Sequence, residues 1–254
     1  MKTTGNKNWM QDCMRRVMVG FHVPDADQTG CPAEKILAEV DPRAIVRQVK
    51  KTGAQAFWYY SKCHRGNAYY PSKVGHVHSA LHGRDLFGEF TQACLEEGIV
   101  PCGVYEFSDR RLPTDKPDWC HQVPPMQLNT QGEWEMTDGV QGASVVSSAC
   151  LNGPYGEFAI QQALEVVSKY PIGAYYVDFL GKFDIYRWAC PYCNKRFKKE
   201  FGFDFPGDAL KMPHDQYLAY LRWHYRQYDG QCHNHQPDGS GWNHQLDHIR
   251  YDLG

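Results

Sequence analysis

Gly173-Ala174-Tyr175-Tyr176-Val177-Asp178-Phe179 is an aromatic and β-branched run whose one ionisable side chain comes near its end. The run is almost continuously apolar rather than alternating, which is typical of a parallel strand buried on both faces. Three earlier runs have the same character, at residues 16–23, 54–60 and 99–106. Together the four runs predict a parallel β-sheet.

The segments between these runs have helical patterns. Asp41 and Pro42 suit the N-cap and first position of a helix that continues to Lys51. Further helices are predicted at 85–97, where Gly98 follows, and at 158–169, before Pro171. Beyond the fourth run, residues 190–201 and 214–228 look helical, and 231–235 is a weak strand candidate. Strands that alternate with helices in this way predict an α/β fold of linked βαβ units.

The number of strands limits which α/β fold this can be. A complete (β/α)₈ TIM barrel places eight strands in about 250 residues, whereas this chain of 254 residues offers four or five. We therefore predict one partial β/α-barrel catalytic domain over residues 1–254, equal to the N-terminal half to five-eighths of a barrel. A long insertion at 107–156 follows the third strand, and 229–254 forms an irregular tail. The chain is a piece of a larger enzyme, or it completes its sheet by self-association, or the fold is open.

Composition excludes several classes of partner. A net charge of −2 argues against nucleic acid and anionic membranes, because both favour a basic surface. The sequence lacks an apolar run of about 18 residues, and residues 1–11 do not resemble a secretory signal, so a cytoplasmic location is expected. The ten cysteines are then expected to be reduced. Aromatic residues make up 14% of the chain, which suits either a packed core or a cleft in which sugars stack on rings.

The carboxyl ends of the predicted strands carry ionisable residues. In parallel β/α folds these ends form the ligand site. Asp178 ends an apolar strand and suits a nucleophile for glycoside transfer, and Glu106 on another strand suits the acid that such a reaction needs. The alternatives are an N-cap or salt-bridge role for Asp178 and a structural acceptor role for Glu106.

Other residues near the strand ends could bind the sugar. Cationic and hydrogen-bonding groups suit sugar hydroxyls, and aromatic rings suit the walls of a cleft. The candidates for substrate binding are His22, Trp58, Tyr60, Lys62, His64, Arg65, Tyr105, Asp109 and Trp119.

Cys190-Pro191-Tyr192-Cys193 is a CxxC pair. A zinc ion would need two more ligands. Cys232 and His235 could supply them, with His233 as a further donor. The fold and the predicted chemistry require no cofactor. The sequence lacks GxGxxG after the first strand, GxxxxGK[ST] and GxSxG, which are motifs of other enzyme classes.

Residues 16–206 resemble the alpha-L-fucosidase family, glycoside hydrolase family 29, and its hypothetical glycosyl hydrolase relatives. The family's Lys-His-His-Asp-Gly motif corresponds to Lys62-Cys63-His64-Arg65-Gly66, and Arg84-Asp85-Leu86 opens a helix as in the family. The resemblance implies a (β/α)₈ barrel, retaining hydrolysis without a cofactor, Asp178 as nucleophile, and His22, Lys62 and His64 in the sugar subsite. Cys-His-Arg replaces the family's His-His-Asp, and the family's acid/base normally comes from later sequence.

Three functional hypotheses follow from these observations. The first is a glycoside hydrolase of the fucosidase-like type that acts on a carbohydrate or glycoside. The second is a non-catalytic carbohydrate-binding or assembly module derived from a glycosidase barrel. The third is a metal-dependent hydrolase that uses the His and Cys residues. The expected partners are a carbohydrate or glycoside substrate and, to complete the barrel, a second copy of the chain or a C-terminal half.

Overall fold

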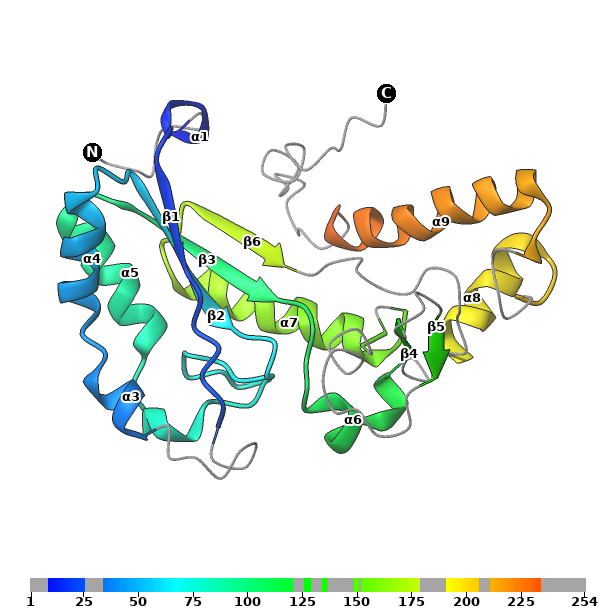
Figure 1. Ribbon diagram of the computed structural model, residues 1–254, viewed down its shortest axis with the longest axis horizontal. Coiled ribbons are helices and arrows are strands. Elements are labelled where there is room, and N and C mark those ends of the chain that lie inside the picture. Colours follow the sequence, from blue (N-terminus) through cyan, green and yellow to red (C-terminus); the bar gives the residue numbers. More distant parts are fainter. Residues whose placement is uncertain are drawn as a thin grey trace.

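The computed structural model describes residues 9–25, 34–120, 126–128, 134–136, 149–150, 152–178, 191–205 and 211–233, apart from the side chains of 11, 34, 35, 113, 126–128, 134–136 and 224–233. Its centre is a parallel four-stranded sheet in the order β1-β2-β3-β6 (Figure 1). The strands are β1 (Arg16–Val19), β2 (Ala56–Lys62), β3 (Val100–Glu106) and β6 (Ala174–Asp178). The predicted α/β fold is confirmed: this sheet is an arc of a (β/α)₈-type barrel.

Helices connect consecutive strands and end where the sequence indicates. Asp41 caps α4, since its carboxylate accepts a hydrogen bond from the Ala44 amide. Asp85 caps α5 in the same way, and Gly98 ends that helix in the left-handed conformation. Apart from two short helices in the predicted insertion, the described helices before β6 are α1 (Trp9–Asp12), α3 (Glu34–Glu39), α4 (Pro42–Lys51), η1 (Ser79–Leu81), α5 (Leu86–Glu97) and α7 (Pro154–Lys169). The last begins at Pro154 rather than at 158, because proline suits the first helical position.

The two faces of the sheet differ because side chains alternate along each strand. Phe57 and Tyr59 of β2 pack on Phe87 and Phe90 of α5, which defines the helix-covered face. Trp58, on the other face, meets Tyr176 of β6 edge to face. This second face is the inner face of the arc. It is more open than the first, since Met18 on β1 is 49% exposed.

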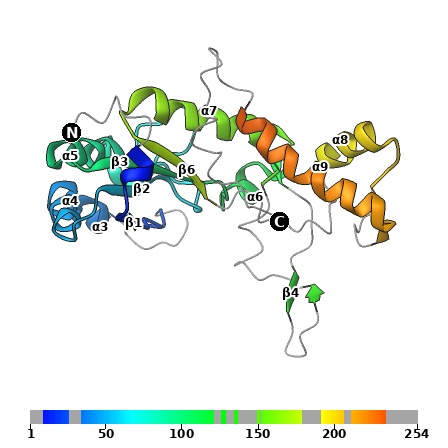
Figure 2. The same cartoon turned by 90° about the horizontal axis from the view of Figure 1, so that it is seen from above.

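The predicted insertion at 107–156 contains short elements that the sequence analysis did not identify. These are α6 (Leu112–Asp115), η2 (Pro117–Trp119) and an antiparallel pair, β4 (Met126–Leu128) with β5 (Trp134–Met136). Figure 2 shows this pair well away from the parallel sheet. The last residues of the predicted insertion already belong to α7.

A second hydrophobic cluster lies on α8 (Pro191–Phe201) and α9 (His214–His233). Figures 1 and 2 place these helices beyond the sheet, on the side away from α4 and α5. The strand candidate at 231–235 is wrong over 231–233, because α9 continues to His233 and so enters the predicted tail. Within the described part of the chain, no helix is both long and apolar enough to cross a membrane.

Candidate functional site

The ends of three neighbouring strands bring two carboxylates together. Glu106 of β3 and Asp178 of β6 are partners in the parallel register, as are Val104 and Tyr176 two residues earlier. Register partners lie on the same face of a sheet, and neighbouring strands are about 4.8 Å apart. Tyr60 of β2 is the register partner of Val104, so its side chain belongs to the same inner face. The two predicted catalytic carboxylates therefore share one face at the carboxyl edge of the sheet.

Two tyrosine hydroxyls contact the carboxylate of Asp178. The Tyr60 hydroxyl lies 3.4 Å from Oδ2, and the Tyr176 hydroxyl lies 3.3 Å from Oδ1. Burial raises the pKa of Tyr60, and the negative charges of Glu106 and Asp178 raise it further. The phenol therefore stays protonated at neutral pH, and its O–H donates a hydrogen bond to Asp178. The half-buried carboxylate of Asp178 is thus held in a fixed orientation.

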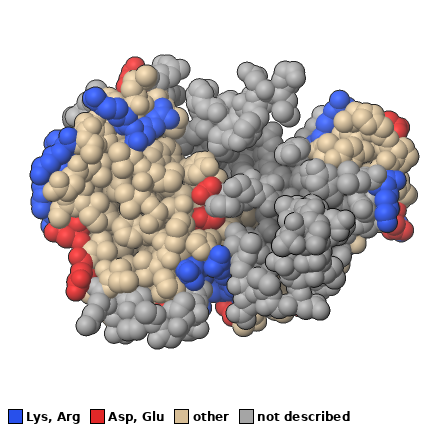
Figure 3. Space-filling view, in the orientation of Figure 1, with Lys and Arg blue, Asp and Glu red and all other residues tan. Residues whose placement is uncertain are grey.

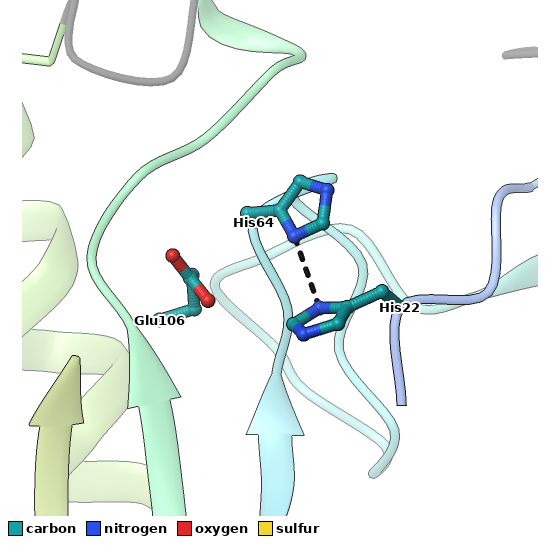
Figure 4. A group of neighbouring side chains, drawn as sticks. All are labelled: His22, His64 and Glu106. Carbon is teal, nitrogen blue, oxygen red and sulfur yellow. Dashed lines mark hydrogen bonds between the residues drawn. The ribbon is translucent and has the colours of Figure 1, made fainter. Parts of the chain in front are cut away.

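Two histidines, His22 and His64, lie next to Tyr60, and Figure 4 shows the pair. The Nδ1 atoms of His22 and His64 are 3.0 Å apart and hydrogen bonded, and the His22 ring meets Tyr60 edge to face at 4.7 Å. Burial lowers the pKa of His64 to about 4, and the nearby His22 and Arg110 contribute to this. Burial also lowers the pKa of His22. Both rings are therefore neutral at pH 7, and each can donate and accept hydrogen bonds.

Glu106 reaches toward the histidine pair from the end of β3 (Figure 4). It is 1% exposed, and one of its oxygens accepts a hydrogen bond from the Ser108 hydroxyl at 2.7 Å. One ligand atom each from Glu106, His22 and His64 lie within 4.8 Å of one another. Two imidazoles and a carboxylate are a donor set that suits zinc and similar divalent ions. The same three groups could equally hydrogen bond to a sugar.

Lys62 lies beneath this site rather than in it. Its side chain is fully buried, and its ammonium donates to the backbone oxygens of Glu106 and Ser108 at 2.9 and 2.8 Å. The ammonium also pairs with the buried Asp109 carboxylate at 3.4 Å. The prediction that Lys62 and Asp109 contact the substrate is therefore corrected. The two buried side chains pair with each other, and Lys62 fixes the loop that follows β3.

Gly66 explains part of the Lys62–Gly66 motif. Its φ is +82°, and a Cβ at this position would lie 2.3 Å from the Asp109 carboxylate. Only glycine fits both the left-handed backbone and this close approach. Arg111 completes the contact, since its amide donates to Asp109 at 2.9 Å and its Nε donates to Asn67 at 3.0 Å. The loops after β2 and β3 are thus locked together.

A buried aspartate fixes the loop after β1 in a similar way. Asp25 is 1% exposed and accepts hydrogen bonds from His76 Nε2 and the Ser79 amide, both at 2.9 Å. This contact ties the segment that carries His22 to the segment around η1. His76 and Ser79 have no motif spacing to reveal the contact, so sequence reasoning missed it.

The other predicted wall residues lie in different places. Tyr105 is on the helix-covered face, and its buried hydroxyl donates to Gln162 of α7 at 3.0 Å, so its predicted place in the cleft is wrong. Trp58 is on the inner face, two residues before Tyr60 in β2. Trp119 packs on Phe158 of α7, with 5.5 Å between the ring centroids.

The predicted zinc ligands are largely outside the described residues, since Cys190, His235 and the side chain of Cys232 are not described. Cys193 is buried in α8, and its Sγ is 3.4 Å from Sγ of Cys150. The spacing of the CxxC pair gives no indication of this contact, because Cys150 lies 43 residues earlier.

Comparisons with known proteins agree with this architecture. Residues 41–179, more than half of the chain, match the family model described as hypothetical glycosyl hydrolase 6. Among solved structures, alpha-L-fucosidase isoenzyme 2 from Paenibacillus thiaminolyticus is similar with a TM-score of 0.62 and 23% identity, over 86% of this chain and 29% of that chain. Alpha-L-fucosidase AlfC from Lactobacillus casei in complex with alpha-L-fucose product has a TM-score of 0.47 and 19% identity, over 69% of this chain and 62% of that chain. At such identity the first likeness shows the fold alone, and this chain spans less than a third of that fucosidase. No curated protein sequence matches significantly.

Proposed function

We propose that this chain, which belongs to the hypothetical glycosyl hydrolase 6 family, is an alpha-L-fucosidase-like glycoside hydrolase that retains configuration at the anomeric carbon. Asp178 is the nucleophile and Glu106 is the acid and base. The observation that carries the proposal is the in-register pairing of these two carboxylates on the inner face at the carboxyl edge of the sheet.

The spacing of the strands favours retention over inversion. Retaining enzymes hold their carboxyl groups about 5–5.5 Å apart, and inverting enzymes about 6.5–9.5 Å apart. Register partners on strands about 4.8 Å apart agree with the shorter separation. The contacts from Tyr60 and Tyr176 support the role of Asp178, because they orient its carboxylate.

The reaction proceeds in two steps. In the first, an oxygen of Asp178 forms a bond to the anomeric carbon while the glycosidic C–O bond breaks, and the proton of Glu106 goes to the leaving oxygen. In the second, Glu106 takes a proton from water, whose oxygen attacks the same carbon and releases Asp178. His22 and His64, both neutral, hydrogen bond to sugar hydroxyls, and Trp58 contributes an aromatic surface on the inner face.

The proposal also covers the setting of the enzyme. The remaining barrel strands come from a second copy of the chain or from a further segment. No disulfide joins the cysteines that the structure describes, which supports a cytoplasmic location. The substrate is a carbohydrate or glycoside, and nucleic acid and membrane are not partners.

Asp178→Asn tests the nucleophile. Asn keeps the shape of the side chain and removes its charge, so turnover of a panel of aryl glycosides should fall below detection while the circular dichroism spectrum stays unchanged. Asp118→Asn, at an exposed position in η2, is the matched control and should keep full activity. A 2-fluoro glycoside should add one sugar mass to the wild type and not to Asp178→Asn. Undiminished turnover by Asp178→Asn would contradict the proposal.

The cluster of His22, His64 and Glu106 supports a second candidate, a metal-dependent hydrolase. Dialysis against EDTA should then abolish turnover, and added Zn²⁺ should restore it. Turnover that survives EDTA excludes this candidate. If the wild type binds glycosides and hydrolyses none, the chain is the carbohydrate-binding or assembly module instead.

A further inference from the structure

We propose that the sugar bound at this site carries an anionic group, a carboxylate or a sulfate ester, that Arg65 and Arg110 recognise. This inference rests on the proposed function, since it names the class of substrate for the same site. The two arginines follow β2 and β3 and attach by hydrogen bonds to the backbone of the two site histidines.

Arg65 is directly attached to the histidine pair. Its Nε donates to the backbone oxygen of His22 at 3.1 Å, and it is the residue after His64. Its guanidinium therefore brings a positive charge to the edge of the subsite.

Arg110 has a guanidinium nitrogen that is buried without a hydrogen bond to any residue that the structure describes. Its backbone amide donates to the His64 oxygen at 2.9 Å, which fixes it beside the histidine pair. The Nε of its half-buried guanidinium is buried and makes no hydrogen bond. The exposed Arg43, by contrast, forms two hydrogen bonds with Glu96, and Arg84 forms two with Glu89. Among the described residues no carboxylate forms an ion pair with Arg110. A partly desolvated guanidinium of this kind is stabilised by an anion that arrives with the ligand.

The electrostatic environment agrees with this placement. Burial lowers the pKa of Arg110, and the positive charge of Arg65 lowers it further, so the two guanidinium groups are close enough to repel each other. The positive charge of Lys62, by contrast, is compensated by Asp109. The histidines are neutral, so among the described residues around them Arg65 and Arg110 supply the positive charge. Figure 3 shows a group of acidic side chains near the centre of one face and a group of basic side chains below it.

This distribution of charge also orients the sugar. Asp178 and Glu106 must lie at the anomeric carbon, where positive charge develops in the transition state. The anionic substituent then lies toward Arg65 and Arg110. A planar guanidinium binds a carboxylate or a sulfate through paired N–H donors, which gives direction as well as affinity.

Matched sugars test the inference. Galactose, glucose and mannose are compared with their uronic acids and their 6-sulfates by ligand-observed NMR titration of the wild-type protein. At least one acidic form should bind about tenfold or more tightly than its neutral parent, since hydrogen bonds to charged groups are the strong ones. The uronic acids and the sulfates form separate arms, which tell a carboxylate ligand from a sulfate ligand. The preference should weaken as NaCl is raised.

Variants assign the preference to the two arginines. Arg110→Met and Arg65→Met should each remove most of the difference between acidic and neutral sugars, and Arg65→Asp should reverse it. Arg47→Met, at an exposed position on α4, is the control and should keep the wild-type preference. Equal binding of acidic and neutral sugars by the wild type, or no binding of any acidic sugar, overturns the inference. A preference that survives in Arg110→Met and Arg65→Met overturns it as well.

The outcome is separable from that of the proposed function. Turnover of neutral aryl glycosides without any charge preference leaves the hydrolase standing and removes the anionic substrate. A preference that depends on the arginines, in a wild type that hydrolyses neither aryl uronides nor neutral aryl glycosides, removes the hydrolase and leaves anion recognition.

Discussion

Tyr59 and Tyr60 are adjacent in β2, yet their hydroxyls serve opposite faces of the same sheet. Tyr59 bonds to Thr91 of α5 at 2.7 Å and packs among the phenylalanines that join helix to sheet. Tyr60 reaches Asp178 at 3.4 Å and meets the His22 ring. On the helix-covered face, polar groups fix one element to another. On the inner face, they gather at the strand ends around two carboxylates.

The difference shows how a single strand contributes to both stability and chemistry. Because side chains alternate, every second residue is available for the site without disturbing the contact between helix and sheet. Substitutions on the inner face should therefore affect catalysis and leave folding intact. Substitutions on the helix-covered face should do the reverse.

Glu106→Gln is the strongest test of this division. Loss of the acid should lower kcat about 10²–10⁴-fold, the usual contribution of general acid–base catalysis. Stability should stay close to that of the wild type, because glutamine still accepts the hydrogen bond from Ser108. Steady-state kinetics and thermal unfolding measure the two effects, with the exposed Glu39→Gln as control. A large loss of stability with unchanged kcat would show that Glu106 stabilises the fold and takes no part in catalysis.

Lys62→Met tests the supporting side. The change leaves the Asp109 carboxylate buried without its ammonium, and removing one partner of a buried pair costs about 3–5 kcal/mol. The free energy of unfolding in urea should fall by that amount. Adding Asp109→Asn should recover part of the loss, because the uncompensated charge is gone. A loss below about 1 kcal/mol would show that the pair contributes no more than an exposed salt bridge does.

Tyr59→Phe and Tyr60→Phe make the matched comparison. Tyr59→Phe loses a buried hydrogen bond and should lower the free energy of unfolding by about 1 kcal/mol without affecting kcat. Tyr60→Phe loses a longer contact and should lower kcat, while stability changes by less than about 0.5 kcal/mol. Urea denaturation and kinetics on both variants check this. If Tyr59→Phe and Tyr60→Phe change the free energy of unfolding by the same amount and kcat by the same factor, the two faces do not separate stability from catalysis.

Most of the fold was predictable because its signals are local. The apolar runs gave the strands, and Asp41, Asp85 and Gly98 marked helix ends through capping chemistry that acts within one turn. The β4–β5 pair was missed because its strands are only three residues long. The strand candidate at 231–235 failed over 231–233 because α9 extends to His233.

The candidate site was predictable in outline and less so in detail. The rule that ligands bind at strand ends selected His22, Glu106 and Asp178, which the structure brings to one edge. The rule cannot tell which polar side chains turn inward and become paired. Lys62 and Asp109 satisfied it and yet are buried together. Arg110 was overlooked, because nothing in its sequence context shows that its Nε has no hydrogen-bond partner among the described residues.

The smallest expected effect is the pH dependence that His64 adds to stability. In the folded protein burial holds its pKa at about 4, whereas an unfolded histidine has the ordinary value of 6.5. Between these pH values His64 binds a proton in the unfolded chain and stays neutral in the folded chain, so acidification favours unfolding. The contribution is present above pH 6.5, falls as the pH decreases toward 4, and levels off below that. His64→Gln cannot titrate, so the melting temperature of the wild type relative to this variant should decrease from pH 7 to pH 5. His214→Gln, at an exposed position, should follow the wild-type curve. Parallel curves for the wild type and His64→Gln would mean that His64 has the same pKa in the folded and the unfolded chain. The edge of the inner face would then be more hydrated than the contact between His64 and His22 implies.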